Sequence, residues 1–126
     1  MSSIYCSHPY CLGVLQELLS KSREDVAVSV ITEAELRTGA AKSSSPVKTL
    51  GLVENFLRPL TIIEFTSQDA VAYAQVRAKL ERVGKPIGPL DTIIASQAVA
   101  RDLTLVTNNE REFRRVSGLR VETWAG

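Results

Sequence analysis

The sequence predicts an α/β fold in which a parallel sheet carries helices on both faces. Short β-branched apolar runs alternate along the chain with segments of helical periodicity. These short runs are almost wholly apolar, which is typical of parallel strands covered on both sides. The 126 residues, 44% hydrophobic and with a net charge of +1, suit one domain with its own core. We therefore expect a single domain over residues 1–126.

The expected strands and helices follow from residue type and spacing. Strands are predicted over 26–31, 60–65, 103–106 and 119–123, where Val, Ile, Leu and Thr dominate. Helices are predicted over 12–20, 32–41, 47–56, 67–83, 91–101 and 110–116. Ser67 is a favourable N-cap for the fourth of these helices, and the Gly- and Pro-rich segment 84–89 must end it.

Several classes of protein are excluded by composition. The near-neutral charge excludes a strongly basic DNA-packaging protein. No apolar stretch approaches the roughly 20 residues that cross a bilayer, and the first residues do not resemble a secretory signal. Cys6, His8 and Cys11 resemble a metal clip, but three ligands without a second pair do not make a structural zinc site. We expect a cytoplasmic protein without membrane contact.

Acidic and amide side chains follow the predicted strands at one edge of the sheet. Glu35 follows the first strand, Asn109 and Glu112 follow the third, and Asp91 begins the helix before the third strand. Ligands of open parallel sheets bind beyond the carboxyl ends of the strands, and oxygen ligands from separate segments suit Mg²⁺. Each residue also fits a helix cap, as in the capping box Thr32-x-x-Glu35, and spacing alone does not decide between the two interpretations.

A basic cluster lies close to this predicted acidic edge. Arg111, Arg114 and Arg115, with Arg120 nearby, could contact a phosphate backbone or could form a solvated helix face. No phosphate-binding loop accompanies them, because the glycines at 84 and 88 lack the following Lys-Ser/Thr.

Three segments of the chain resemble the PIN-domain toxins of the VapC type. They are SVITEAELRTGA (29–40), PIGPLDTIIASQAVA (86–100) and LVTNNEREFRRVSGLRVETW (105–124), and the likeness extends over about residues 12–124. The resemblance implies a three-layer α/β/α sandwich around a parallel sheet. It also implies an endoribonuclease toxin of a type II toxin–antitoxin system that depends on Mg²⁺ or Mn²⁺, is paired with a VapB-type antitoxin and forms a homodimer.

The resemblance also implies roles for individual residues. Glu35 matches the acid of the family's E-L/M-x-x-G helix, and Asp91 matches the acid of its P-x-D-x-x-I-A helix. Asn109 stands where many members have an acid, so Asn109 or Glu112 completes the site. The expected catalytic residues are Glu35, Asp91 and Asn109, and the expected metal ligands are Glu35, Asp91 and Glu112. The expected contacts to RNA or antitoxin are Thr107, Arg111, Arg114 and Arg115.

The chain departs from the family pattern at its start. Family members begin with an apolar strand ending in Leu-Asp-Thr-Asn, whose Asp is a central metal ligand, whereas the first Asp here is Asp25. We therefore expect the fold to lack its first strand and one carboxylate, through a late start codon or a degenerate gene. The alternative function is a catalytically impaired PIN-like remnant that only binds antitoxin or partner. A response-regulator-like or nucleotide-binding domain shares the fold class, but the acids with a Lys or the Gly-rich first turn that it needs are not evident.

Overall fold

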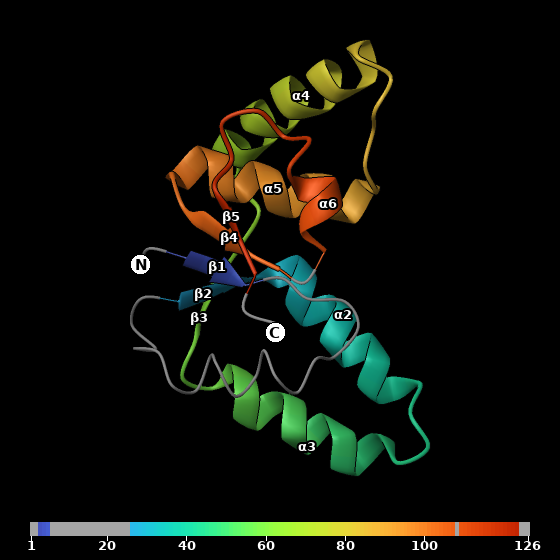
Figure 1. Cartoon of the computed structure of the whole chain (residues 1–126). Coiled ribbons are helices and arrows are strands. Elements are labelled where there is room, and N and C mark those ends of the chain that lie inside the picture. Colours follow the sequence, from blue (N-terminus) through green and yellow to red (C-terminus); the bar gives the residue numbers. More distant parts are fainter. Residues whose placement is uncertain (1–2, 6–25, 108, 124–126) are drawn as a thin grey trace.

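The computed structural model describes residues 3–5, 26–107 and 109–123, and Figure 1 shows how their helices and strands are arranged. The strands are β1 (Ser3–Tyr5), β2 (Val26–Ser29), β3 (Thr61–Ile63), β4 (Thr104–Val106) and β5 (Val121–Glu122). The helices are α2 (Val30–Ala41), α3 (Pro46–Leu57), α4 (Ser67–Arg82), α5 (Pro89–Arg101) and α6 (Glu110–Phe113).

The strands form one five-stranded sheet in the order β3-β2-β1-β4-β5, and every neighbouring pair is parallel. This confirms the predicted α/β class. The expectation that the first strand is missing is wrong, because Ser3–Tyr5 occupies the central position between β2 and β4. A central parallel strand must be apolar, and Ile4, which pairs with Ala27 on one side and Leu105 on the other, is fully buried. The three residues of β1 include no carboxylate.

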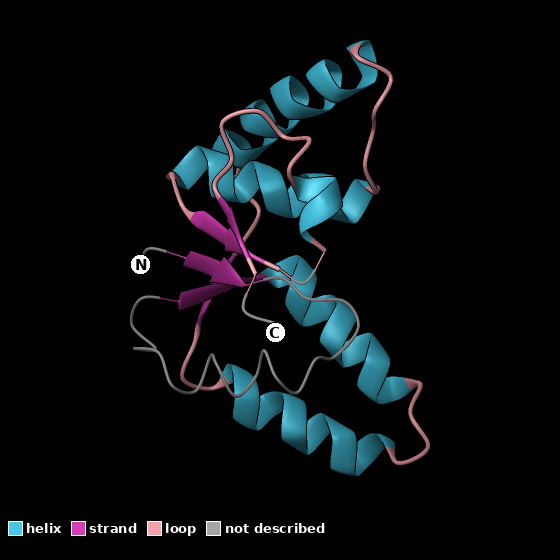
Figure 2. Ribbon diagram, in the orientation of Figure 1, coloured by secondary structure: helices cyan, strands magenta, loops and turns pink. Residues whose placement is uncertain are grey.

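Helices cover both faces of the sheet, as Figure 2 shows: α4, α5 and α6 lie on one side, and α2 and α3 lie on the other. Strand β2 divides its side chains between the two resulting cores. Ala27 joins a core with Ile94 and Phe113, whereas Val26 and Val28 join a second core on the side of α2 and α3. Because successive strand residues point to opposite faces, an apolar run such as 26–28 indicates a strand buried on both sides.

Three helices, α2, α3 and α5, begin one or two residues before their predicted starts. Helix α2 begins at Val30, and its N-cap is Ser29, whose Oγ accepts a hydrogen bond from the Ile31 N–H at 3.0 Å. Thr32 therefore lies inside the helix and is not its cap. Helix α4 is capped by Thr66 rather than Ser67, and Thr66 forms a capping box with Asp69.

Two predictions lie outside the described residues: the helix over 12–20, and the Cys6, His8 and Cys11 group. Within the described ranges, no helix combines the length and the apolar character needed to cross a membrane.

Candidate active site

Four of the predicted site residues line one open pocket of about 500 Å³ at the carboxyl ends of the strands. Glu35 comes from α2, Asp91 from α5, and Asn109 and Glu112 from the start of α6. The remaining lining residues are Gly88, Pro89 and Leu90. The predicted convergence of these side chains from separate segments is thus present in the folded chain.

The first turn of α5 places Asp91 at the pocket. Pro89 opens the helix after the N-cap Gly88, so Asp91 lies in the first turn and is not the cap that its position suggested. A Cβ added at Gly88 would lie 3.7 Å from Asp91 Oδ2, which shows how closely the backbone passes the carboxylate. A carboxylate in the first turn is stabilised by the positive end of the helix dipole.

The turn after β4 is ordered by Thr107. The Asn109 N–H donates to Thr107 Oγ1 at 3.0 Å, and Asn109 Nδ2 donates to Glu112 Oε2 at 3.5 Å. Thr107 is only 1% exposed, and its hydroxyl holds the Asn109 backbone. Asn109 is the N-cap residue of α6 but makes no side-chain capping bond.

The acids of the pocket fit a hydrated divalent cation better than a cage made entirely of protein ligands. Among the residues described, no three acidic, His or Cys side chains lie close enough to hold one ion together, so Glu35, Asp91 and Glu112 do not form a compact triad. Mg²⁺ keeps several waters and is usually held by one or two carboxylates with substrate phosphates. Glu35 and Asp91, on two helices facing the same open pocket, match that requirement.

The predicted arginines do not share one environment. Arg114 Nη2 forms an ion pair with Glu110 Oε2 at 2.9 Å. Arg115 Nη1 donates to the Pro86 carbonyl at 3.1 Å, and Arg111 and Arg115 line a second pocket. Arg120 pairs with Asp102 at 2.9 Å on an exposed surface.

A buried hydrogen-bond network, not found from the sequence, joins the elements that carry the two acids. Ser29, at the end of β2, donates to Gln97 Oε1 on α5, and Gln97 Nε2 donates to the Ile63 carbonyl at the end of β3 at 3.2 Å. Ser29 and Gln97 are fully buried. Since Ser29 caps the helix of Glu35, and Gln97 lies on the helix of Asp91, these bonds set the position of one helix against the other.

Replacing Gln97 with Leu is expected to destabilise the fold by about 2 kcal/mol, because it removes a partner of the buried Ser29 hydroxyl and of the Ile63 carbonyl. Urea denaturation of both proteins measures this difference. Gln75→Leu, at an exposed position of α4, is the matched control and should change stability by less than about 0.5 kcal/mol. Equal losses in the two variants would mean that the network does not stabilise the fold.

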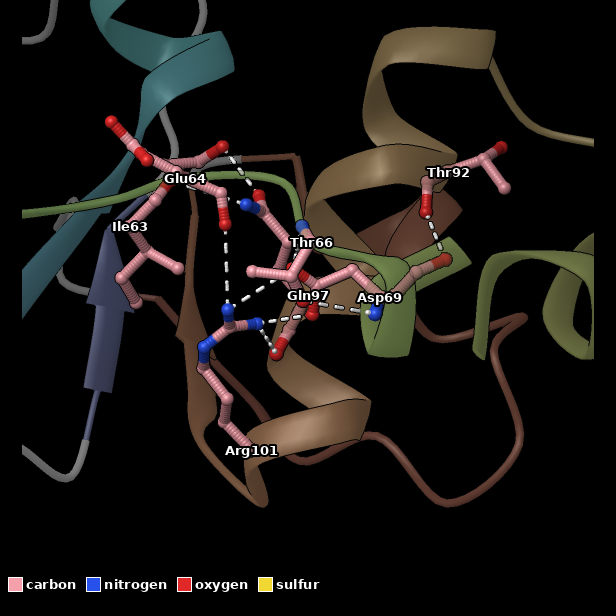
Figure 3. Close-up of polar contacts among 9 residues, drawn as sticks. Ile63, Glu64, Thr66, Asp69, Thr92, Gln97 and Arg101 are labelled. Carbon is pink, nitrogen blue, oxygen red and sulfur yellow. Dashed lines mark hydrogen bonds and ion pairs between the residues drawn. The ribbon is translucent and has the colours of Figure 1, made fainter. Parts of the chain in front are cut away.

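A second buried polar contact lies beside this network (Figure 3). Arg101 on α5 forms an ion pair with Asp69 through both carboxylate oxygens, and its Nη2 also donates to the Glu64 carbonyl at 3.4 Å. Burial raises the pKa of Asp69, but the hydrogen bonds from Arg101 and from the Thr66 N–H and hydroxyl outweigh it, so the pKa lies below its usual value. The pair fastens the start of α4 to the end of α5.

Known proteins resemble this chain in both sequence and fold. A family model described as PIN domain matches residues 5–119. A Salmonella typhimurium protein named "tRNA(fMet)-specific endonuclease VapC" is 41% identical over 110 residues, which are 87% of this chain and 83% of that protein. A Haemophilus influenzae protein named "Ribonuclease VapC2" is 41% identical over 111 residues, 86% of this chain and 84% of that protein.

Solved structures agree with the sequence relatives. The crystal structure of DNA-bound VapBC from Salmonella typhimurium contains a chain that matches with a TM-score of 0.89 and 34% identity, covering 98% of each chain. VapBC2 from Rickettsia felis, bound to a DNA fragment from its promoter, matches with a TM-score of 0.83 and 33% identity, covering 98% of this chain and 99% of that one.

The parallel sheet, with acids gathered beyond its carboxyl edge, and the matching family model show that the chain belongs to the PIN-domain family. Within that family the curated relatives identify it as a protein of the VapC type.

Proposed function

We propose that the chain is a metal-dependent endoribonuclease toxin of a type II toxin–antitoxin system. The observation that carries this proposal is the open pocket in which Glu35 and Asp91, from different helices, lie together with Asn109 and Glu112. The names of the relatives, an endonuclease specific for tRNA(fMet) and a ribonuclease, support RNA as the substrate class. Binding by a VapB-type antitoxin, a homodimer and a cytoplasmic location complete the proposal, and the VapBC complexes among the similar structures support the antitoxin.

In this mechanism the side chains of the chain bind and orient the reacting groups. Glu35 and Asp91 would hold Mg²⁺ or Mn²⁺, and Glu112, oriented by Asn109, borders the same space. A bound divalent cation would supply water with a lowered pKa and would stabilise the charge on the leaving oxygen. Thr107 keeps the Asn109 backbone in place, so that the turn presents its polar groups to the pocket.

Removal of divalent cations is expected to lower RNA cleavage to the background rate, because the carboxylates alone repel the phosphate backbone. The assay incubates the purified chain with tRNA(fMet) and an unrelated RNA, with EDTA, with Mg²⁺ and with Mn²⁺. Cleavage should return when Mn²⁺ is added in excess of EDTA. Cleavage that continues unchanged in EDTA would count against a metal-dependent reaction.

A second candidate function is a catalytically impaired module that binds antitoxin or another partner without cutting RNA. It is favoured by the absence of a carboxylate from β1 and of a compact acid triad within the described part of the chain. Co-purification with a VapB-type antitoxin, with no cleavage and no Mn²⁺ binding by calorimetry, would support this candidate against the enzyme.

A further inference from the structure

A second open pocket, of about 440 Å³ and here called the basic pocket, lies beside the candidate active site, which is here called the acidic pocket. The basic pocket is lined by Lys85, Arg111 and Arg115 together with Gly84 and Pro86. Three of these five residues are cations, and none is acidic. The sequence singled out both arginines, but nothing in the sequence joined Lys85 to them.

The basic pocket and the acidic pocket are adjacent because the same two segments border both. The segment 84–86 lines the basic pocket, and its continuation 88–91 lines the acidic one. At the start of α6, Arg111 faces the basic pocket while the next residue, Glu112, faces the acidic pocket. Two sites of opposite charge therefore lie next to each other at one edge of the molecule.

The three arginines of this region divide into two groups. Arg115 donates to the Pro86 carbonyl at 3.1 Å, which holds its guanidinium against the wall of the basic pocket. Arg114 does not line that pocket, and its charge is partly neutralised by Glu110 at 2.9 Å. Arg111 and Arg115 are therefore placed for an anionic ligand, and Arg114 is not.

We propose that the basic pocket binds a backbone phosphate of the RNA strand, next to the phosphate that is cleaved at the acidic pocket. This inference rests on the proposed function and deepens it. An RNA strand carries a phosphate at every nucleotide. When one phosphate lies at Asp91, the neighbouring phosphates of the strand therefore lie further along the surface of the protein. Arginine guanidinium groups match phosphate oxygens through paired hydrogen bonds, and Lys85 adds a point charge.

An RNA phosphate fits the basic pocket better than a segment of antitoxin does. Protein partners are held mainly by apolar and aromatic anchors in well-packed pockets. Among the described residues, Pro86 is the sole apolar side chain that lines this pocket. The acidic pocket repels RNA until a cation is bound, so the binding affinity must come from a neighbouring cationic site. Phosphate contacts contribute to affinity without regard to base sequence.

The test measures binding and cleavage separately in Arg111→Ala, Lys85→Ala and the matched control Arg114→Ala. Fluorescence anisotropy of a short labelled single-stranded RNA in EDTA, over a range of salt concentrations, gives affinity without cleavage. Arg111→Ala and Lys85→Ala should each weaken binding about tenfold and reduce the salt slope by about 0.7, the value for one phosphate of a single strand. Arg114→Ala should change affinity less than about twofold. Arg111→Lys should restore part of the loss, and thermal melting confirms that each variant is folded.

The outcomes separate this inference from the proposed function. Loss of RNA binding in Arg111→Ala but not in Arg114→Ala supports the phosphate site even if no variant cleaves RNA. Equal RNA affinity in the two variants, with cleavage intact, overturns the phosphate site and leaves the enzyme proposal standing. Unchanged RNA affinity with weaker antitoxin binding in Arg111→Ala overturns it as well, and would assign the pocket to the protein partner.

Discussion

Asp91→Asn and Glu35→Gln are each expected to reduce the rate of RNA cleavage by more than about 100-fold. Replacing a residue that only orients a metal ligand lowers metal affinity or activity about 10- to 100-fold. The loss of a ligand itself should therefore lower activity by more than that. Each amide keeps the size of the carboxylate but removes its negative charge. Because Glu35 and Asp91 line one pocket, the two variants should show similar losses of cleavage and of Mn²⁺ binding, measured by calorimetry.

Glu33→Gln provides the matched control for these active-site variants. Glu33 lies on the same helix as Glu35, and its carboxylate pairs with Arg37 at 2.9 Å rather than lining the acidic pocket. Its replacement should leave cleavage within about twofold and cost less than about 0.5 kcal/mol of stability. If Asp91→Asn cleaves as fast as Glu33→Gln, the acidic pocket is not the site of the reaction.

Asp69→Asn is expected to lower the free energy of unfolding by about 3 kcal/mol. The substitution leaves Arg101 without its charged partner inside the protein and removes an acceptor from the capping box of α4. Asp69 is 1% exposed and Arg101 is 26% exposed, so little water is available to replace the lost contact. For a chain of this length the midpoint of thermal unfolding should fall by about 12 °C.

Asp102→Asn tests whether burial is the cause of the loss of stability expected for Asp69→Asn. Asp102 also pairs with an arginine, Arg120, but their side chains are 86% and 57% exposed. The left-handed backbone of Asp102 (φ 54°) is one that Asn adopts easily. The expected cost is less than about 0.5 kcal/mol, and similar costs at positions 69 and 102 would contradict the importance of burial.

Because the pKa of Asp69 is lowered, its contribution to the stability of the fold depends on pH. A carboxyl group with a lower pKa in the folded state than in the unfolded state stabilises the fold above its unfolded pKa of about 3.9. That contribution disappears as the pH falls through the folded pKa. The difference in melting temperature between the parent chain and Asp69→Asn should therefore be constant from neutral pH to about pH 5 and shrink below about pH 4. A difference that is as large at pH 2 as at neutral pH would mean that the charge of Asp69 is not what stabilises the pair.

The acidic pocket could be predicted from the sequence because its residues follow directly from local pattern. Asn109 follows β4, Asp91 lies in the first turn of α5, and Glu35 lies in the second turn of the helix that follows β2. The parallel arrangement of the strands brings these positions to one edge of the sheet. The start of α2 was predicted less accurately than the acidic pocket, because Ser29 can either extend a strand or cap a helix. In the structure Ser29 Oγ accepts a hydrogen bond from the Ile31 N–H, so Ser29 is the N-cap and Val30 and Ile31 belong to the helix.

The buried polar network and the basic pocket could not be predicted from the sequence, because they depend on long-range contacts that no local pattern encodes. Gln97 is a polar residue in a helix rich in Ile and Ala, a signal of an internal partner, but the partner Ser29 is 68 residues away. Asp69 and Arg101 are 32 residues apart, and each resembles an ordinary helix-end charge in the sequence. Lys85 lies in a loop, whose course depends on the packing of α4 against α5.

The α/β class, the parallel sheet and the acids gathered beyond its edge could be inferred from the amino-acid sequence. Hydrophobic periodicity and the alternation of strands and helices along the chain are properties of short segments. The central position of Ser3–Tyr5 in the sheet could not be inferred in this way, because it depends on pairing with β2 and β4. Tertiary packing also brings Lys85 to the same pocket as Arg111 and Arg115. Such contacts depend on distances between segments remote in the chain, and folding alone sets those distances.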